Sequence, residues 1–434
     1  MRTEESKPGS TYISQIPKGY FEAKEDIHAP LVKPERSWRA TVTLAEIGFY
    51  AAWFGPIQVL LGLQAAFIAP SDKELVLSLV TGFGAFVSMV SNPFFGALSD
   101  HTTSRYGRRA PWVLGGTLIG VFGLVFLAAS WSVWAMVFSW ALVQAGVNAA
   151  FAALSATLND RIVVERRGEM SGWMAAGQNL GALAGTGVAV AARGIVLGYV
   201  ACITLLCVSV IPYLWRSRDR YLSHRDESYR MTKFISRFWI SPLNYPDFFW
   251  AWFVRLMVLT PFGIITLYLL YYLMDVVRHP NPQYGVLILS GIFTGLTVVI
   301  SVMAGLISDY QGKRKPLIIV SGILMAVSAL ILAFFHSWEA ALVSSIFLGV
   351  GHGCFIPVHF ALTTQVLPPS DDTGRDLGIF NTAAALPQVL SPILAMPILA
   401  LVSNHDTGYS ILFGVCAAWF VLGAVAILKV KSVK

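Results

Sequence analysis

The chain has 434 residues, of which 56% are hydrophobic and only 13% are charged. A soluble domain carries about 25% charged residues, and apolar runs of about 20 residues, long enough to cross a bilayer, recur along this chain. The formal net charge is +7, but the basic residues lie in short segments between apolar runs. They are typical of topology anchors in a membrane protein, so nucleic acid is excluded as a partner.

The sequence has no pattern typical of an enzyme or a metal site. All four cysteines lie inside apolar runs without metal-ligand spacing, so we expect buried thiols, no metal and no cofactor. A phosphate loop, a zinc-spaced His/Cys set and a nucleophile elbow are all missing, and we predict no catalytic residue. Residues 1–38 are polar, without the apolar core of a signal peptide, and are expected to form a cytoplasmic tail.

Twelve apolar runs predict an all-α membrane protein built from two six-helix bundles. The expected spans are 41–69, 75–98, 111–129, 133–158, 170–192 and 195–215, then 248–274, 284–307, 316–335, 340–366, 377–402 and 409–428. We therefore divide the chain into the tail, a first bundle at 39–216, a basic linker at 217–246 and a second bundle at 247–434.

Basic residues test this arrangement. With twelve spans, 27 Lys and Arg residues lie on one side, three on the other and one, Arg255, within a span. Cytoplasmic loops are enriched in Lys and Arg, so both termini are expected on the cytoplasmic side of the cell membrane. Apolar residues at helical spacing in the linker predict an amphipathic helix, which lies either on the inner leaflet or against the protein.

The same motif occurs twice, about 200 residues apart. The first copy contains Gly96-Ala-Leu-Ser-Asp100 followed by Gly107-Arg-Arg-Ala-Pro111, and the second contains Gly305-Leu-Ile-Ser-Asp309 followed by Gly312-Lys-Arg-Lys-Pro316. Such a repeat in a hydrophobic chain indicates a duplicated bundle. Many carriers use duplicated bundles to expose one site alternately to the two sides of a membrane.

The first copy, together with 158–172, resembles loops of sucrose carriers and of the glycoside–pentoside–hexuronide cation symporter branch of the major facilitator superfamily. The resemblance extends over nearly the whole chain after the tail and implies the major facilitator fold. The sodium site of melibiose-type carriers uses carboxylates on the second span. Span 75–98 contains no Asp or Glu, so this site is not carried over.

The charges of the two motif copies predict a latch. A carboxylate and a guanidinium at a half-dry helix end can form a strong ion pair in one conformation and release it in another. The alternative is solvated charge that only fixes topology. The predicted gating residues are Asp100, Arg105, Arg108, Arg109, Asp309, Lys313 and Arg314.

Two charged residues lie early in the pseudo-equivalent first and seventh spans, Glu46 and Arg255. Charges inside a membrane are expensive and are candidates for function. The two can pair with each other, or Glu46 can carry a coupling proton. The alternative is a carboxylate at headgroup level and a snorkelling arginine.

Polar side chains within the spans are the candidates for binding a solute, since amides match hydroxyl groups and aromatic rings cover apolar faces. The alternative is hydrogen bonding between helices. The set is Tyr50, Trp53, Gln144, Asn148, Gln178, Asn179, His352, His359, Asn381 and Gln388. In the first span Glu46, Tyr50, Trp53 and Gln64 are expected on one helix face. Gly181, Gly185, Gly291 and Gly295 are interpreted as close-packing positions, and the resemblance implies that their two spans, the fifth and the eighth, meet across the halves.

The sequence thus predicts a monomeric secondary transporter in the lipid bilayer, with a small polar solute as its partner. A sugar or glycoside is the leading solute and the proton the candidate coupling ion. The alternatives are an exporter of amphipathic compounds and a non-transporting receptor or scaffold on the same fold.

Overall fold

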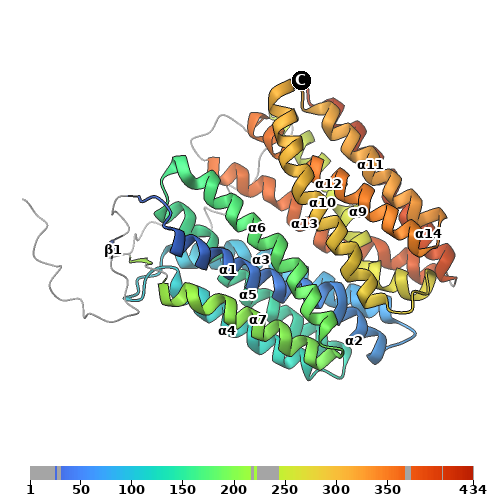
Figure 1. Cartoon of the computed structure of the whole chain (residues 1–434), viewed down its shortest axis with the longest axis horizontal. Coiled ribbons are helices and arrows are strands. Elements are labelled where there is room, and N and C mark those ends of the chain that lie inside the picture. Colours follow the sequence, from blue (N-terminus) through green and yellow to red (C-terminus); the bar gives the residue numbers. More distant parts are fainter. Residues whose placement is uncertain are drawn as a thin grey trace, which may run out of the picture.

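The computed structural model describes residues 25–26, 31–216, 219–221, 244–366, 373–402 and 404–433. The predicted linker helix and most of the predicted tail lie outside these residues. In Figure 1 the first half of the chain comprises α1 (Arg36–Gly55), the π-helical turn η2 (Pro56–Leu60), α2 (Leu61–Ile68), α3 (Lys73–Asp100), α4 (Ala110–Ala128), α5 (Val133–Arg161), α6 (Val164–Ala191) and α7 (Ile195–Arg216).

The second half repeats this order. It comprises α9 (Pro246–Tyr271), the π-helical turn η3 (Tyr272–Val276), α10 (Pro282–Gln311), α11 (Lys315–Phe334), α12 (Trp338–Val366), α13 (Thr373–Leu401), α14 (His405–Ala426) and the 3-10 turn η4 (Ile427–Lys429). The fold is therefore the expected all-helical membrane architecture.

Eleven helices in the described part of the chain are long and apolar enough to cross a membrane. The helix that does not reach this apolarity is α6, the expected fifth span. It has 28 residues, but Gln178, Asn179 and its many glycines lower its mean hydropathy. Its small residues pack against α1, where a Cβ added at Gly185 would lie 2.5 Å from the Ala51 carbonyl oxygen.

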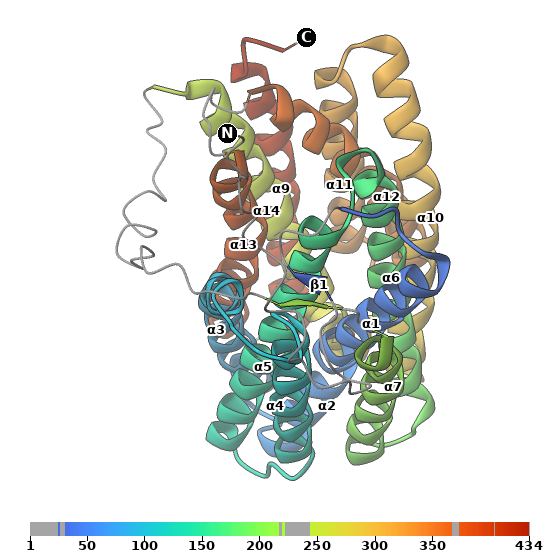
Figure 2. The same cartoon turned by 90° about the vertical axis from the view of Figure 1, so that its left-hand side faces the viewer.

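The helices of each half pack mainly on one another. In the first half α4 packs on α5, α3 on α5, and α1 on α6 and α7; in the second, α10 packs on α12, α11 on α12 and α14, and α9 on α13 and α14. The halves meet where α3 contacts α13 and where α6 contacts α10. Figures 1 and 2 show the two halves side by side, the first in blue to green and the second in yellow to red.

Local sequence signals set several helix ends. The Ser132 hydroxyl accepts from the Ala135 N–H and caps α5, and the Asn404 side chain accepts from Asp406 and Thr407 at the start of α14. Such caps satisfy N–H groups that have no partner inside the helix. Proline stands in the first turn of α4, α9, α10 and α11, where a missing N–H costs nothing.

A π-helical turn interrupts the first span of each half, η2 after α1 and η3 after α9. Such a turn inserts an extra residue, rotates the side chains that follow, and often occurs at functional sites. The expected shared face of Glu46 and Gln64 is therefore wrong. Gln64 lies beyond η2 and is buried inside the first half, where it donates to the Leu127 and Ser130 carbonyls and accepts from the Tyr199 hydroxyl.

The N-terminal segment is attached to the end of the first half that holds its copy of the motif. Strand β1 (Glu25–Asp26) pairs in parallel with β2 (Arg220–Tyr221), and Val32 forms a bridge with Ile162 after α5. We call the end of the molecule with the α3–α4 and α10–α11 connections the motif end, and the opposite end the Lys73 end.

Candidate functional site

The first copy of the motif builds a dense ion-pair cluster at the motif end. Arg109, only 2% exposed, pairs with Asp100 on α3 at 2.5 Å and with Asp160 on α5 at 2.8 Å, and also donates to the Ser99 hydroxyl. Arg108 pairs with Asp160 at 2.6 Å. Burial opposes the charge of Arg109, but the two carboxylates raise its pKa above the usual value. The cluster therefore ties the ends of α3, α4 and α5 together.

Asp219, after α7, supports this cluster from behind. Its carboxylate is 7% exposed and accepts from the backbone N–H groups of Arg109 at 2.6 Å and Ala110 at 2.7 Å. It therefore caps the N-terminus of α4, where a carboxylate is favourable. Burial raises the pKa of Asp219 despite these donors. Sequence reasoning missed both Asp160 and Asp219, because neither lies within the repeated motif.

The second copy of the motif is much looser. Arg314 lies 3.8 Å from Asp309, whose side chain is 74% exposed, and donates to the Ala361 carbonyl on α12. Two predicted gating residues lie outside both clusters. Arg105 packs on the Tyr106 ring and has no ion pair with a described carboxylate, and Lys313 is exposed, also without an ion pair among the described residues.

Glu46 lies at the contact between α1 and α6. It is fully buried, and one carboxylate oxygen accepts from the Gln178 amide at 3.3 Å. The other oxygen has no hydrogen-bond partner among the described residues. Of the two alternatives for Glu46, the pair with Arg255 is not made in this conformation, in which Arg255 lies in the second half near His352 and His359.

Aromatic rings follow Glu46 on the same helix. Tyr50 packs edge-on against Trp53 and stacks on Phe54, and both Tyr50 and Trp53 contact Phe151 on α5. The Trp53 ring N–H has no acceptor among the described residues. Phe151 also lines a cavity of about 280 Å³ that extends to Asp100, which links the aromatic cluster to the motif end.

The other predicted solute contacts divide into two groups. The first group forms hydrogen bonds within the protein: the Asn148 amide donates to Gln144 at 3.1 Å, the Asn179 amide donates to the Ala175 carbonyl, and His359 bonds the Ala251 carbonyl at 3.0 Å. The second group has polar atoms without such a bond, or is exposed or not described. His352 stacks on Phe262 and makes a tilted contact with Phe293, and its Nδ1 has no partner in the described part of the chain. Gln388 is exposed, and the Asn381 side chain lies outside the described residues.

Gln58 is a polar residue that the sequence interpretation did not select. It lies in η2, and its amide oxygen accepts from Thr186 on α6 at 2.6 Å and from Ser290 on α10 at 3.2 Å. Because α6 and α10 belong to different halves, this amide lies at the seam between them. The signal in the sequence was Pro56, which lies two residues before Gln58 and predicts an irregularity in the helix at this point.

The other polar contacts between described residues of the two halves are at the Lys73 end. Lys73 pairs with Asp275, Ser78 bonds the Tyr268 hydroxyl, and Tyr271 donates to the Gly62 carbonyl. At the motif end the ion pairs between described residues stay within each half. Gly181 and Gly185 are close-packing positions as expected, but against α1 rather than across the seam, and a Cβ added at Gly295 would have no described atom within 4 Å.

Two pseudo-equivalent six-span halves, with polar contacts between described residues across the middle of the seam and at the Lys73 end, are typical of a membrane carrier. The family model described as Major Facilitator Superfamily matches residues 42–318 and 281–434, and the chain belongs to this superfamily. No curated protein sequence matches the chain.

Solved transporter structures share the fold at low sequence identity. A peptide transporter POT in complex with sulfate is 14% identical with a TM-score of 0.74, covering 93% of this chain and 96% of that one. The nucleoside transporter NupG is 12% identical with a TM-score of 0.68, covering 92% and 100%. A bacterial homolog of the human lysosomal transporter Spinster, inward-facing and unoccupied, is 13% identical with a TM-score of 0.69, covering 92% and 99%. Membership of the superfamily makes the chain a multi-pass membrane transporter.

Proposed function

We propose that the protein is a secondary carrier of the plasma membrane that moves a small polar solute by alternating access, with both termini cytoplasmic. One observation carries this proposal: the described polar contacts between the halves lie at mid-seam and at the Lys73 end, not at the motif end. With the basic motif end toward the cytoplasm, this is the arrangement of a carrier open to the inside. A receptor or scaffold does not need a seam that closes at one end only.

A sugar or glycoside is the proposed solute, in keeping with the resemblance of the motif loops to sucrose carriers. Gln58 offers a polar atom at the seam, Gln178 and His352 offer polar atoms within the spans, and Trp53 offers both a ring face and an unused N–H. Hydroxyl groups can both donate and accept, and the C–H face of a sugar packs on aromatic rings. This combination supports a polyhydroxylated ligand.

Glu46 is the proposed coupling residue. A carboxylate buried without a cationic partner costs free energy unless it takes up a proton, and no described cation pairs with Glu46. We propose that Glu46 is protonated in this conformation and releases its proton when the seam rearranges. Glu46→Gln should then abolish uphill accumulation and leave solute exchange largely intact; accumulation driven by a pH gradient in this variant would exclude Glu46.

An exporter of amphipathic compounds is the second candidate, favoured by the cluster of Tyr50, Trp53, Phe54 and Phe151. Purified protein in liposomes separates the two functions. We expect uptake of at least one labelled sugar from a panel that includes sucrose and melibiose, measured with and without a proton gradient. Efflux of an amphipathic dye without uptake of any sugar would favour the exporter.

A further inference from the structure

Three side chains of α9 and η3 reach from the second half into the first at the Lys73 end. The Tyr268 hydroxyl lies 2.5 Å from the Ser78 hydroxyl, and Tyr271 donates to the Gly62 carbonyl at 2.9 Å. Asp275, inside the π-helical turn η3, accepts from the Lys73 ammonium at 2.6 Å. These contacts form one continuous strip across the seam.

The Lys73–Asp275 pair is shielded from solvent. The two side chains are 12% and 16% exposed, and the Lys73 ammonium lies 5.1 Å from the centre of the Tyr271 ring. Removing one partner of a shielded ion pair leaves a charge with neither water nor a counterion, which is strongly unfavourable. The pair therefore favours the conformation in which the halves are in contact.

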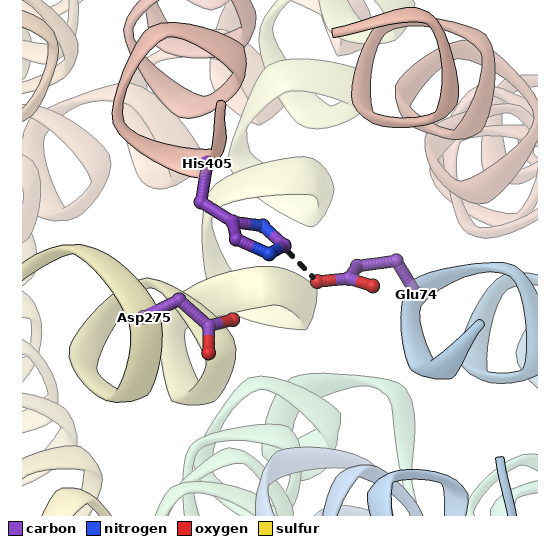
Figure 3. A group of neighbouring side chains, drawn as sticks. All are labelled: Glu74, Asp275 and His405. Atoms are coloured by element: carbon purple, nitrogen blue, oxygen red, sulfur yellow. Dashed lines mark ion pairs between the residues drawn. The ribbon is translucent and has the colours of Figure 1, made fainter. Parts of the chain in front are cut away.

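Two more charged groups meet at this point. Figure 3 shows Glu74 of α3 facing His405 of α14 and Asp275 of η3; the distance from His405 Nδ1 to the nearest Glu74 oxygen is 3.9 Å. The ligand atoms of the three residues lie within 4.8 Å of one another. Lys73 already supplies a cation to Asp275, so the group is an ion-pair cluster rather than a metal site.

We propose that Lys73, Glu74, Asp275 and His405 form a proton-sensitive clasp that holds the two halves shut at the Lys73 end. The proposal deepens the proposed transport function, because opening this clasp is the step that would expose the seam to the opposite side. Lys73 and Glu74 belong to the first half, and Asp275 and His405 to the second, so both ion pairs exist only when the halves touch.

His405 gives the clasp its dependence on pH. Histidine takes up a proton between about pH 8 and pH 5, and only the protonated ring pairs with Glu74. The groups around it are Lys73 and Glu74 on α3, Asp275 on η3 and Asp406 on α14 itself. Protonation of the ring adds a second ion pair between the halves, so acid on this side should strengthen closure.

Distances between the halves test the clasp without any solute, so the result does not depend on which compound is transported. Spin labels at Ser71→Cys and Pro280→Cys, both exposed, report on the Lys73 end in a background where the four native cysteines are replaced by alanine. Lys73→Met should raise the ratio of open to closed protein about tenfold or more. The charge exchange Lys73→Asp with Asp275→Lys should largely restore closure.

The matched control is Arg39→Met, which breaks a 2.5 Å ion pair with Glu169 inside the first half and should leave the distance distribution unchanged. An unchanged distribution in Lys73→Met, or an equal change in Arg39→Met, would overturn the clasp. In a Glu46→Gln background, which removes the proposed coupling carboxylate, lowering the pH from 8 to 5.5 should raise the closed fraction about twofold to fivefold, and adding His405→Gln should remove this response. A pH response that persists in His405→Gln would overturn the role of the histidine.

Discussion

The two copies of the motif share a sequence pattern but not a structure. In the first, Arg109 is buried and contacts Asp100, Asp160 and Ser99. In the second, Arg314 lies 3.8 Å from a largely exposed Asp309 and bonds a backbone carbonyl. The difference arises outside the motif, because α5 supplies Asp160 while the described last turns of α12 contain no carboxylate. A motif therefore sets which charges are available, and the neighbouring helices decide how strongly they are held.

The largest expected difference between the copies is in stability. Arg109→Met removes charge-assisted hydrogen bonds to both Asp100 and Asp160, each worth roughly 1.5–3 kcal/mol, although Arg108 still pairs with Asp160. Arg314→Met removes a looser, more exposed contact and should cost less than about 1 kcal/mol. Thermal unfolding of the purified variants measures both. Equal losses would mean that the partners supplied by α5 do not matter.

Substitution of Asp219 should cause the next largest loss of stability. Among the described residues, only the first copy of the motif has a carboxylate that caps the helix after it. Asp219→Ala removes the acceptor of the Arg109 and Ala110 N–H groups and should cost roughly 1–3 kcal/mol. Asp219→Asn keeps one acceptor oxygen for these donors and should be milder. A loss in Asp219→Asn as large as in Asp219→Ala would contradict the cap.

The pH dependence of Asp219 follows from its raised pKa. A carboxyl whose folded-state pKa lies above its unfolded value favours folding most at low pH, and this contribution is lost as pH rises through the folded-state value. The stability of the parent relative to Asp219→Asn should therefore decrease as pH rises from about 4 toward neutrality. Unfolding midpoints across that range test the sign, and a difference that increases with pH would contradict it.

The difference between the two copies should be smaller in transport rate than in stability. Asp100→Asn weakens the pair with Arg109, and a charge-assisted hydrogen bond contributes roughly 1.5–3 kcal/mol, reduced here because Asp100 is half-exposed. We expect a severalfold fall in transport at matched abundance, with a smaller change in Asp309→Asn. Normal rates in Asp100→Asn would favour topology anchoring over a latch.

The smallest effects should come from motif charges that lie outside both clusters. Arg105→Ala and Lys313→Ala remove exposed residues with no ion pair to a described carboxylate, and each should change stability by less than about 0.5 kcal/mol. Transport at matched abundance should also be unchanged. A strong transport defect in either variant would indicate that the charge is used in another conformation.

The sequence by itself determined the membrane class, the duplicated halves and the charges of the motif loops. Apolar runs and clustered basic residues are local signals, because a bilayer acts on every segment of a given length and charge in the same way. The sequence also selected Glu46 and Gln178 as polar residues within spans, but it did not predict that the two side chains contact each other.

Only the tertiary structure decided which polar groups meet. The π-helical turn η2 rotated Gln64 away from Glu46 and placed Gln58 at the seam. The contacts of Arg109 with Asp160 and with Asp219 join residues about 50 and about 110 positions apart in the sequence, and the Lys73–Asp275 pair joins residues about 200 positions apart. Such contacts result from how the halves pack, and neither helical periodicity nor composition contains that information.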